Sequence, residues 1–178
     1  CVQVQGLVTL ANLAAGSDAC KADILAAEGA EACAKACACE RSHLELQLQA
    51  MRLCANLTSS GGHGIECILK GGCVPTAVYA MASHYLDEGV MWLGARVLAN
   101  VAETAEGVLK ICEAGGATAV VIALEVHTEE AELYAEGCRA LANLAFADGE
   151  KPGEARVPTW REVGRSAVEA ALTEQAID

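Results

Sequence analysis

A four-residue motif, Leu-Ala-Asn-Leu or a close variant of it, occurs four times and constrains the fold more than any other feature of the chain. It stands at residues 10–13, 54–57, 98–101 and 141–144. The asparagines in the four copies are separated by 44, 44 and 43 residues. A constant period of this length is typical of proteins built from stacked helical units. The sequence therefore predicts a tandem array.

Each period carries the same three helical segments. A polar break follows the asparagine, then come a short helix, a glycine stop, a middle helix and a long amphipathic helix that leads to the next asparagine. The predicted stops are Gly29, Gly72 and Gly116. The predicted helices are long ones at 2–14, 45–58, 89–102 and 129–146, short ones at 19–27, 65–70 and 105–113, and middle ones at 30–41, 75–86 and 117–127. Because one unit cannot bury its apolar faces alone, we expect about four units to stack into an all-α solenoid.

The repeat array is predicted over residues 1–147, and its first repeat is incomplete. Residues 148–157 are rich in turn-forming residues and predict a loop. Residues 158–178 open with a capping-box pattern and predict a C-terminal helix that covers the open end of the solenoid. Because the chain starts at Cys1 and enters a repeat at once, we expect it to be a segment of a longer polypeptide.

Composition and charge exclude several classes of function. Aromatic residues make up only 3% of the chain and proline occurs three times, which favours packed helices. The net charge of −12 disfavours binding to nucleic acid or to an anionic membrane surface. No apolar run approaches the roughly 20 residues that span a bilayer. The ten cysteines lie mostly in alanine-rich helical runs, so we expect free thiols in a reducing, intracellular and cytoplasmic compartment.

The glycine stops and the long third helices carry a resemblance to a known family. The clearest segments are Gly-Ala-Arg-Val-Leu-Ala-Asn-Val at 94–101 and Gly-Cys-Arg-Ala-Leu-Ala-Asn-Leu at 137–144. In these features, over residues 2–147, the chain resembles the armadillo repeat family. The resemblance implies a right-handed superhelix whose third helices line a concave groove, where a ladder of asparagines holds the backbone of an extended partner peptide. HEAT repeats are the nearest alternative, but their units usually have two helices and lack this asparagine.

The position four residues before the asparagine departs from the pattern of the peptide-binding armadillo proteins. Those proteins often place Trp there, whereas this chain has Val8, Arg52, Arg96 and Arg139. The difference disfavours a basic ligand of the nuclear-import type. A guanidinium group is a planar fork that suits carboxylates, so the arginines favour an acidic partner segment or a C-terminal carboxylate.

The candidate partner-binding surface combines the asparagines with the residues four and eight positions before them, which share a helix face. In the functional interpretation, asparagine amides bind a peptide backbone and arginines select carboxylates. In the structural interpretation, asparagine links neighbouring repeats, arginine is a solvated side chain and Trp92 only fills space. The candidate residues are Asn12, Asn56, Asn100, Asn143, Arg52, Arg96, Arg139 and Trp92.

Cysteine and histidine supply weaker candidates for chemistry. Cys33, Cys37 and Cys39 with His43 form the densest possible metal cluster, but the Cys-x-x-Cys spacing of zinc motifs is absent. Counted from the glycine stops, Cys67 falls where Ile24 and Ile111 fall in the neighbouring units, which indicates a core position. We therefore expect no bound metal and no cofactor. The histidines His43, His63, His84 and His127 lie near predicted helix ends, where surface and capping roles are expected in place of catalysis.

Three hypotheses follow. The leading one is a non-enzymatic scaffold that binds a protein or peptide, acidic or extended, along the third helices. The second is a structural segment of a larger multiprotein assembly. The third is a thiol-dependent or metal-dependent regulatory domain built on the cysteines.

Overall fold

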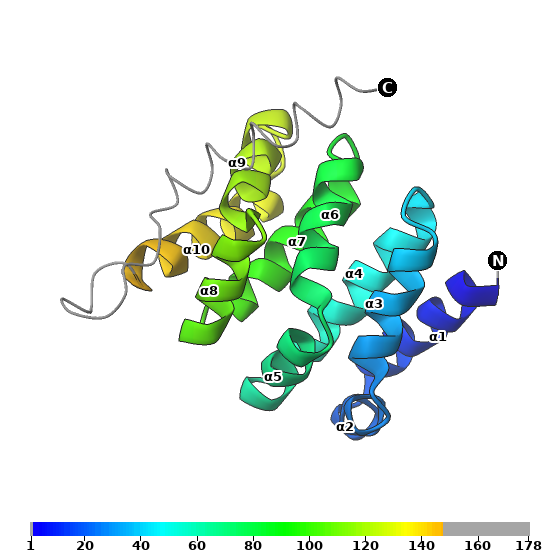
Figure 1. Cartoon of the computed structure of the whole chain (residues 1–178). Helices are drawn as coiled ribbons and strands as arrows, with labels where there is room; N and C mark the ends of the chain where they lie inside the picture. Colours follow the sequence, from blue (N-terminus) through cyan, green and yellow to red (C-terminus); the bar gives the residue numbers. More distant parts are fainter. Residues whose placement is uncertain (1, 148–178) are drawn as a thin grey trace.

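A computed structural model describes residues 2–147 of the chain, and these residues form an all-helical fold (Figure 1). Within this part there are ten α-helices and no strand. The prediction of an all-α chain is confirmed. The helices are α1 (Val2–Gly16), α2 (Asp18–Ala26), α3 (Gly29–Cys39), α4 (Leu44–Thr58), α5 (Gly62–Lys70), α6 (Cys73–Ser83), α7 (Glu88–Val101), α8 (Ala105–Glu113), α9 (Gly116–Val126) and α10 (Ala131–Ala147). Cys1, the predicted loop at 148–157 and the predicted helix at 158–178 lie outside the described residues.

The helices recur in a short, middle and long order. The three full units are α2–α3–α4, α5–α6–α7 and α8–α9–α10, and α1 is the long helix of a further unit. The helix that differs most from its prediction is α6, which begins at Cys73, two residues before the predicted start, and ends at Ser83, three residues before the predicted end. Pro75 therefore lies in the first turn of α6, where its missing N–H is not needed.

The units are placed so that equivalent helices lie beside one another (Figure 1). Long helix packs on long helix in the order α1, α4, α7 and α10, and middle helices α3, α6 and α9 form a second row against them. The short helices α2, α5 and α8 join the two rows. Each long helix between two others is therefore buried on several sides.

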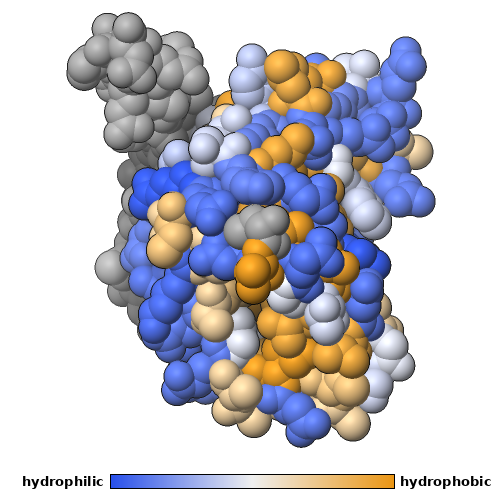
Figure 2. Space-filling view, turned by 90° about the vertical axis from the view of Figure 1, so that its right-hand side faces the viewer, coloured by the Kyte–Doolittle hydropathy of each residue, from blue (hydrophilic) through white to orange (hydrophobic). Residues whose placement is uncertain are grey.

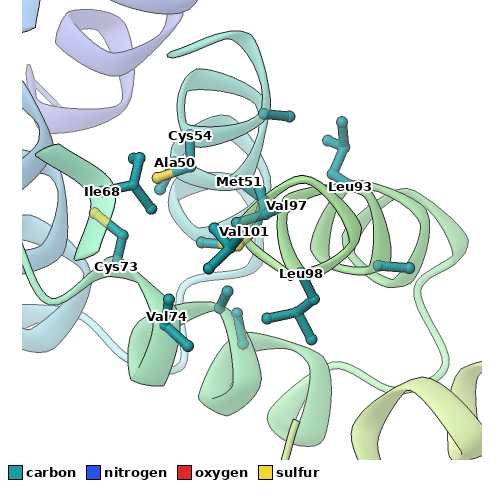
Figure 3. Close-up of a cluster of buried hydrophobic side chains, with 14 of the residues drawn as sticks. Ala50, Met51, Cys54, Ile68, Cys73, Val74, Leu93, Val97, Leu98 and Val101 are labelled. Atoms are coloured by element: carbon teal, nitrogen blue, oxygen red, sulfur yellow. The ribbon is translucent and has the colours of Figure 1, made fainter. Parts of the chain in front are cut away.

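Small and aliphatic side chains make this close packing possible. Figure 3 shows one cluster of the core, where α4, α5, α6 and α7 meet. Leu98, Val97 and Val101 of α7 are fully buried there, as is Met51 of α4. Alanine fills much of the remaining core and lets helix backbones approach, while burial of the aliphatic groups contributes about 25 cal/mol per Å² of apolar surface. The core side chains labelled in Figure 3 are Ala50, Met51, Cys54, Ile68, Cys73, Val74, Leu93, Val97, Leu98 and Val101.

The turn between the short and middle helices differs from the prediction by one residue in two of the units. The residues in the left-handed region are Glu28, Gly72 and Gly115, with φ of 56°, 72° and 74°. Of the three predicted stops, only Gly72 lies at the turn itself. Gly29 and Gly116 instead begin α3 and α9. A Cβ at either position would approach an isoleucine methyl group to 2.5 or 2.6 Å, so these glycines permit close packing and do not form the turn.

The corrected turn also changes the assignment of Cys67. Counted from Glu28, Gly72 and Gly115, the equivalent core residues are Ile24, Ile68 and Ile111, and all three are buried. Cys67 lies one residue earlier and is partly exposed. The prediction that Cys67 occupies the isoleucine position is wrong.

No single helix among residues 2–147 is both long and apolar enough to cross a membrane. Two helix pairs, α5 with α6 and α8 with α9, meet the length and composition criteria only when taken together, and each pair is bent by 75°.

Two glycines near the start of the short helices leave room for a backbone carbonyl oxygen that lies against them. A Cβ on Gly107 of α8 would overlap the carbonyl oxygen of Val101, and one on Gly64 of α5 would overlap that of Leu57. We expect Gly107→Ala to lower the free energy of unfolding by about 1–3 kcal/mol, the usual cost of overpacking. Denaturant titration measures it.

Gly62→Ala is the matched control, because nothing lies within 4 Å of a Cβ at Gly62. If Gly107→Ala is no less stable than Gly62→Ala, the close approach of α8 to the end of α7 is incorrect.

Candidate functional site

The predicted partner-binding residues all lie on the long helices, near one another in the row. Because α1, α4, α7 and α10 lie side by side, residues at equivalent repeat positions form rows across them. Asn12 is on α1, Arg52 and Asn56 on α4, Trp92, Arg96 and Asn100 on α7, and Arg139 and Asn143 on α10.

The asparagine side chains bind the preceding long helix. Asn56 Nδ2 donates to the carbonyl oxygen of Ala11 at 3.0 Å, and Asn143 Nδ2 donates to that of Ala99 at 3.2 Å. Both acceptors directly precede an asparagine of the repeat motif. The bonds span 45 and 44 residues of sequence, so each one joins two units.

Asn100 reaches the equivalent carbonyl through an intermediate hydroxyl. Its Nδ2 donates to Thr58 Oγ1 at 2.8 Å, and Thr58 Oγ1 donates to the carbonyl oxygen of Ala55 at 3.0 Å. Ala55 stands directly before Asn56. Asn12 is exposed and has no hydrogen bond of this kind within residues 2–147. Asn56, Asn100 and Asn143 thus each use one amide hydrogen in a contact with another unit, as the structural interpretation expects.

Arg139 is engaged by acidic and polar side chains. Its Nη2 donates to Glu136 Oε2 and to Asn100 Oδ1, each at 2.6 Å, and its Nη1 lies 3.2 Å from Glu103 Oε1. Glu136 and Arg139 are on α10. Asn100 is on α7, and Glu103 follows the end of α7. Arg139 therefore joins α10 to α7 and has two carboxylates beside it.

Arg52 and Arg96 differ from Arg139. Arg96 lies 4.0 Å from Glu136 Oε1, and its guanidinium carbon is 6.0 Å from the centre of the Trp92 ring. Arg52 makes no ion pair with the described residues. Trp92 is partly buried and packs against the core as well. The structure therefore brings Trp92 and Arg96 together and leaves Arg52 available to solvent.

The predicted cysteine cluster is divided by the fold. Cys33 and Cys37 are buried, Cys39 is exposed, and His43 Nδ1 accepts a hydrogen bond from the backbone N–H of Leu46 at the start of α4. The sequence did not reveal that Cys54, from the next helix, lies 3.9 Å from Cys33 sulfur to sulfur. Among residues 2–147 no group of three or more potential ligands is placed to hold a metal ion.

The buried thiols have perturbed acidity. Contact with the Cys33 thiol, and burial in addition, raise the pKa of both Cys37 and Cys54 above the ordinary thiol value. These two groups are therefore neutral near pH 7, and they act as small apolar residues of the core.

Two histidines make a further contact between units. His127 Nε2 lies 2.8 Å from the carbonyl oxygen of Tyr85, and His84 Nε2 lies 3.4 Å from that of Arg41. Each histidine is the C-cap residue of a middle helix, and each reaches the loop of the preceding unit. The prediction of a capping role is confirmed for His43. The contacts of His84 and His127 with the preceding unit were not predicted. The 43-residue spacing between these two histidines, which matches the repeat, is the sequence feature that could have indicated them.

Comparison with known proteins supports the fold. No family model and no curated protein matches the chain. Crystal structures of three engineered proteins from the Northeast Structural Genomics Consortium are similar to it, with TM-scores of 0.70, 0.70 and 0.67 at 29%, 27% and 23% sequence identity. The alignments cover 93%, 97% and 96% of this chain. The chain spans 61%, 47% and 74% of the lengths of those proteins. These likenesses show an all-helical, repeat-like fold.

The asparagine contacts predict a measurable effect on stability. Asn56→Ala removes the donor to Ala11 and leaves that carbonyl without its side-chain partner, so we expect the free energy of unfolding to fall by about 1 kcal/mol. Denaturant titration again provides the measurement.

Asn12→Ala serves as the control, since Asn12 is exposed and alanine is the better helix former. Equal stability of the two variants would show that the bond between Asn56 and Ala11 contributes nothing to holding the units together.

Proposed function

We propose that the chain is a non-enzymatic interaction scaffold, built as a right-handed solenoid of armadillo type, that binds an extended segment of a partner protein along its third helices. Four observations support the proposal: the 43–44-residue period, the three-helix unit, the row of adjacent long helices and the asparagine at the same position in each. In this arrangement α1, α4, α7 and α10 are the third helices, and their solvent-facing side is the third-helix face.

The observation that carries the proposal is the stacked pair Trp92 and Arg96 on α7. Tryptophan and arginine are the residues most often found as hot spots of protein interfaces. Here the two side chains already lie against one another, 6.0 Å from guanidinium carbon to ring centre, so little side-chain freedom is lost on binding. Arg52 occupies the equivalent position on the neighbouring helix α4 and adds a second guanidinium group.

The charges of the third-helix face define the partner. Arg52 and Arg96 offer planar donors that suit carboxylates on a segment lying across α4 and α7. Farther along, Glu103 and Glu136 already neutralise Arg139, so α10 does not favour an acidic side chain. We therefore propose a partner segment whose acidic residues contact α4 and α7 and whose remainder, over α10, is neutral or basic.

The asparagines retain capacity for a backbone ligand. Asn56 uses one amide hydrogen for Ala11, and an Asn side chain carries two donors and a carbonyl acceptor. A second hydrogen and the oxygen of Asn56 can thus pair with an extended peptide. Asn100 has less capacity, because Arg139 already donates to its oxygen.

A second candidate function is that of a structural segment in a larger assembly. The observation that favours it is the extent to which polar groups of the long helices bind other units. Asn56, Asn100, Asn143 and Arg139 all do so. Under this alternative the third-helix face has no peptide ligand.

A displayed library of unstructured peptides distinguishes the two. Under the scaffold proposal, the purified chain enriches peptides rich in Asp and Glu, and the double variant Arg52→Gln, Arg96→Gln binds the enriched peptides at least about tenfold more weakly, a loss of about 1.4 kcal/mol. Fluorescence anisotropy with labelled peptides gives the dissociation constants.

Arg41→Gln is the matched control, since Arg41 lies over the ring of Tyr79, 4.9 Å from its centre, and is not on the third helices. Failure to enrich any peptide, or equal binding by the double variant, would exclude the third-helix face as a peptide site and leave the structural alternative.

A further inference from the structure

Four buried cysteines from three helices come together in the core, where two complete units of the array meet. The Cys33 sulfur of α3 lies 3.9 Å from the Cys54 sulfur of α4. The Cys37 thiol also hydrogen-bonds Cys33, and the Cys73 thiol of α6 hydrogen-bonds Cys54. Figure 3 shows Cys54 and Cys73 within the buried core. We call these four residues the thiol cluster, and each is no more than 2% exposed.

The thiol cluster does not lie at an end of the array. Figure 2 faces the end at which α1 lies, and hydrophobic residues gather on the lower half of that end. Since α1 belongs to an incomplete repeat, its exposure indicates no partner. The thiol cluster instead has helices of two complete units around it, α3 and α4 of the first and α6 of the second.

The other units do not have cysteine at the corresponding positions. Counted from the left-handed turn residue or from the repeat asparagine, Cys33 corresponds to Ala77 and Val120, and Cys54 to Leu98 and Leu141. The remaining correspondences are Met81 and Leu124 for Cys37, and Gly29 and Gly116 for Cys73. Aliphatic residues and glycine therefore suffice to fill this part of the core. Packing alone does not explain why four thiols occur together.

The contacts within the thiol cluster favour ionisation of one member. Hydrogen bonds from Cys37, and in addition from Cys54, lower the pKa of Cys33 despite its burial. The pKa values of Cys37 and Cys54 are raised, so these two thiols keep their protons and donate to the Cys33 sulfur. Because the thiolate is the form of cysteine that reacts as a nucleophile, Cys33 is the nucleophile of the cluster.

A cavity of about 310 Å³ between α3 and α6 leads toward the thiol cluster. It is lined by the exposed residues Ala38 and Tyr79 and by the buried Cys37, whose thiol contacts Cys33. Gln47 also lines the cavity and is 1% exposed, and its Oε1 has no hydrogen-bond partner among the described residues. That oxygen can accept a hydrogen bond from a small polar molecule that enters.

We propose that Cys33 and Cys54 are an oxidative modification site, at which hydrogen peroxide that enters the cavity forms a disulfide between α3 and α4. Peroxide fits the site because it is small, uncharged and able to donate O–H hydrogen bonds. A bulky oxidant does not reach sulfurs that are 2% and 1% exposed. The site lies in the core and is separate from the third-helix face.

The reaction takes place in two steps. In the first, the Cys33 thiolate attacks one peroxide oxygen and the O–O bond breaks, which gives a sulfenic acid at Cys33 and hydroxide. The hydroxide takes up the proton that Cys33 had released. In the second, the Cys54 sulfur attacks the Cys33 sulfur, the S–O bond breaks, and the oxygen leaves as water with the Cys54 proton. Two thiols are thus oxidised to one disulfide while one peroxide is reduced to two waters.

The bond also requires the two sulfurs to approach. An S–S bond is about 2.05 Å long, so rotation about χ1 of both side chains must bring the sulfurs together from 3.9 Å.

Peptide mapping of the full chain tests the proposal. The reduced, folded chain is treated with hydrogen peroxide, its free thiols are alkylated after unfolding, and it is cleaved after lysine and arginine, which separates Cys33 from Cys37 at Lys35. We expect mass spectrometry without reduction to find a peptide pair joined through Cys33 and Cys54. In Cys54→Ala the link is lost, and dimedone traps a sulfenic acid at Cys33.

Two variants at other cysteines complete the mapping. Cys33→Ala leaves Cys54 reduced, and the fold tolerates it because alanine stands at the corresponding position in the next unit, Ala77. Cys39→Ala is the control, since Cys39 is exposed and outside the thiol cluster, and it forms the link as the wild type does.

A second comparison tests the route of entry. Ala38→Trp places a large side chain at the mouth of the cavity and is expected to slow formation of the link at least threefold. Ala82→Trp is the matched control, because Ala82 is the corresponding exposed residue of α6. The proposal is overturned if Cys33 and Cys54 stay reduced while Cys39 is oxidised, if Cys33 links to Cys37 or Cys73 instead, or if the two tryptophan variants react at equal rates.

Discussion

The packing of each long helix against the next is the constraint on which the rest of the structure depends. The short and middle helices have apolar surfaces that only the long helices and their neighbours can cover. Close contact between long helices requires alanine or glycine at the facing positions, which explains why Ala11, Ala55 and Ala99 directly precede the asparagines and are buried. The period of the sequence is thus the number of residues between one long helix and the next long helix that packs against it.

The polar groups of the long helices add specificity to that contact. A carbonyl oxygen of a helix has two lone pairs and can accept a further hydrogen bond, and Asn56 and Asn143 each donate to one in the preceding long helix. Such bonds contribute modest stability, about 1 kcal/mol each, but they are satisfied only in one register. This role and ligand binding compete for the same amide groups. For this reason the proposed peptide contacts depend more on Trp92, Arg52 and Arg96 than on the asparagine ladder.

Several features could be predicted from sequence because they depend on local pattern. The helices follow from apolar spacing, and the unit boundaries follow from the recurring asparagine. The turn at Glu28 could not be predicted, because the left-handed region favours glycine and Gly29 stands next to it. The ion pair of Arg139 with Glu103 spans 36 residues, so no local pattern reveals it. The contact between Cys33 and Cys54 likewise depends on how α3 and α4 pack within one unit.

Native-state hydrogen exchange tests most directly whether the row of long helices supports the fold. Amides in the middle of α4 and α7, which are packed between two other long helices, are expected to exchange most slowly and only through global unfolding. Amides of α1, with its uncovered apolar face, are expected to exchange faster through local opening. The account is contradicted if α1 is protected as strongly as α7, or if the short helices α5 and α8 exchange more slowly than α4 and α7.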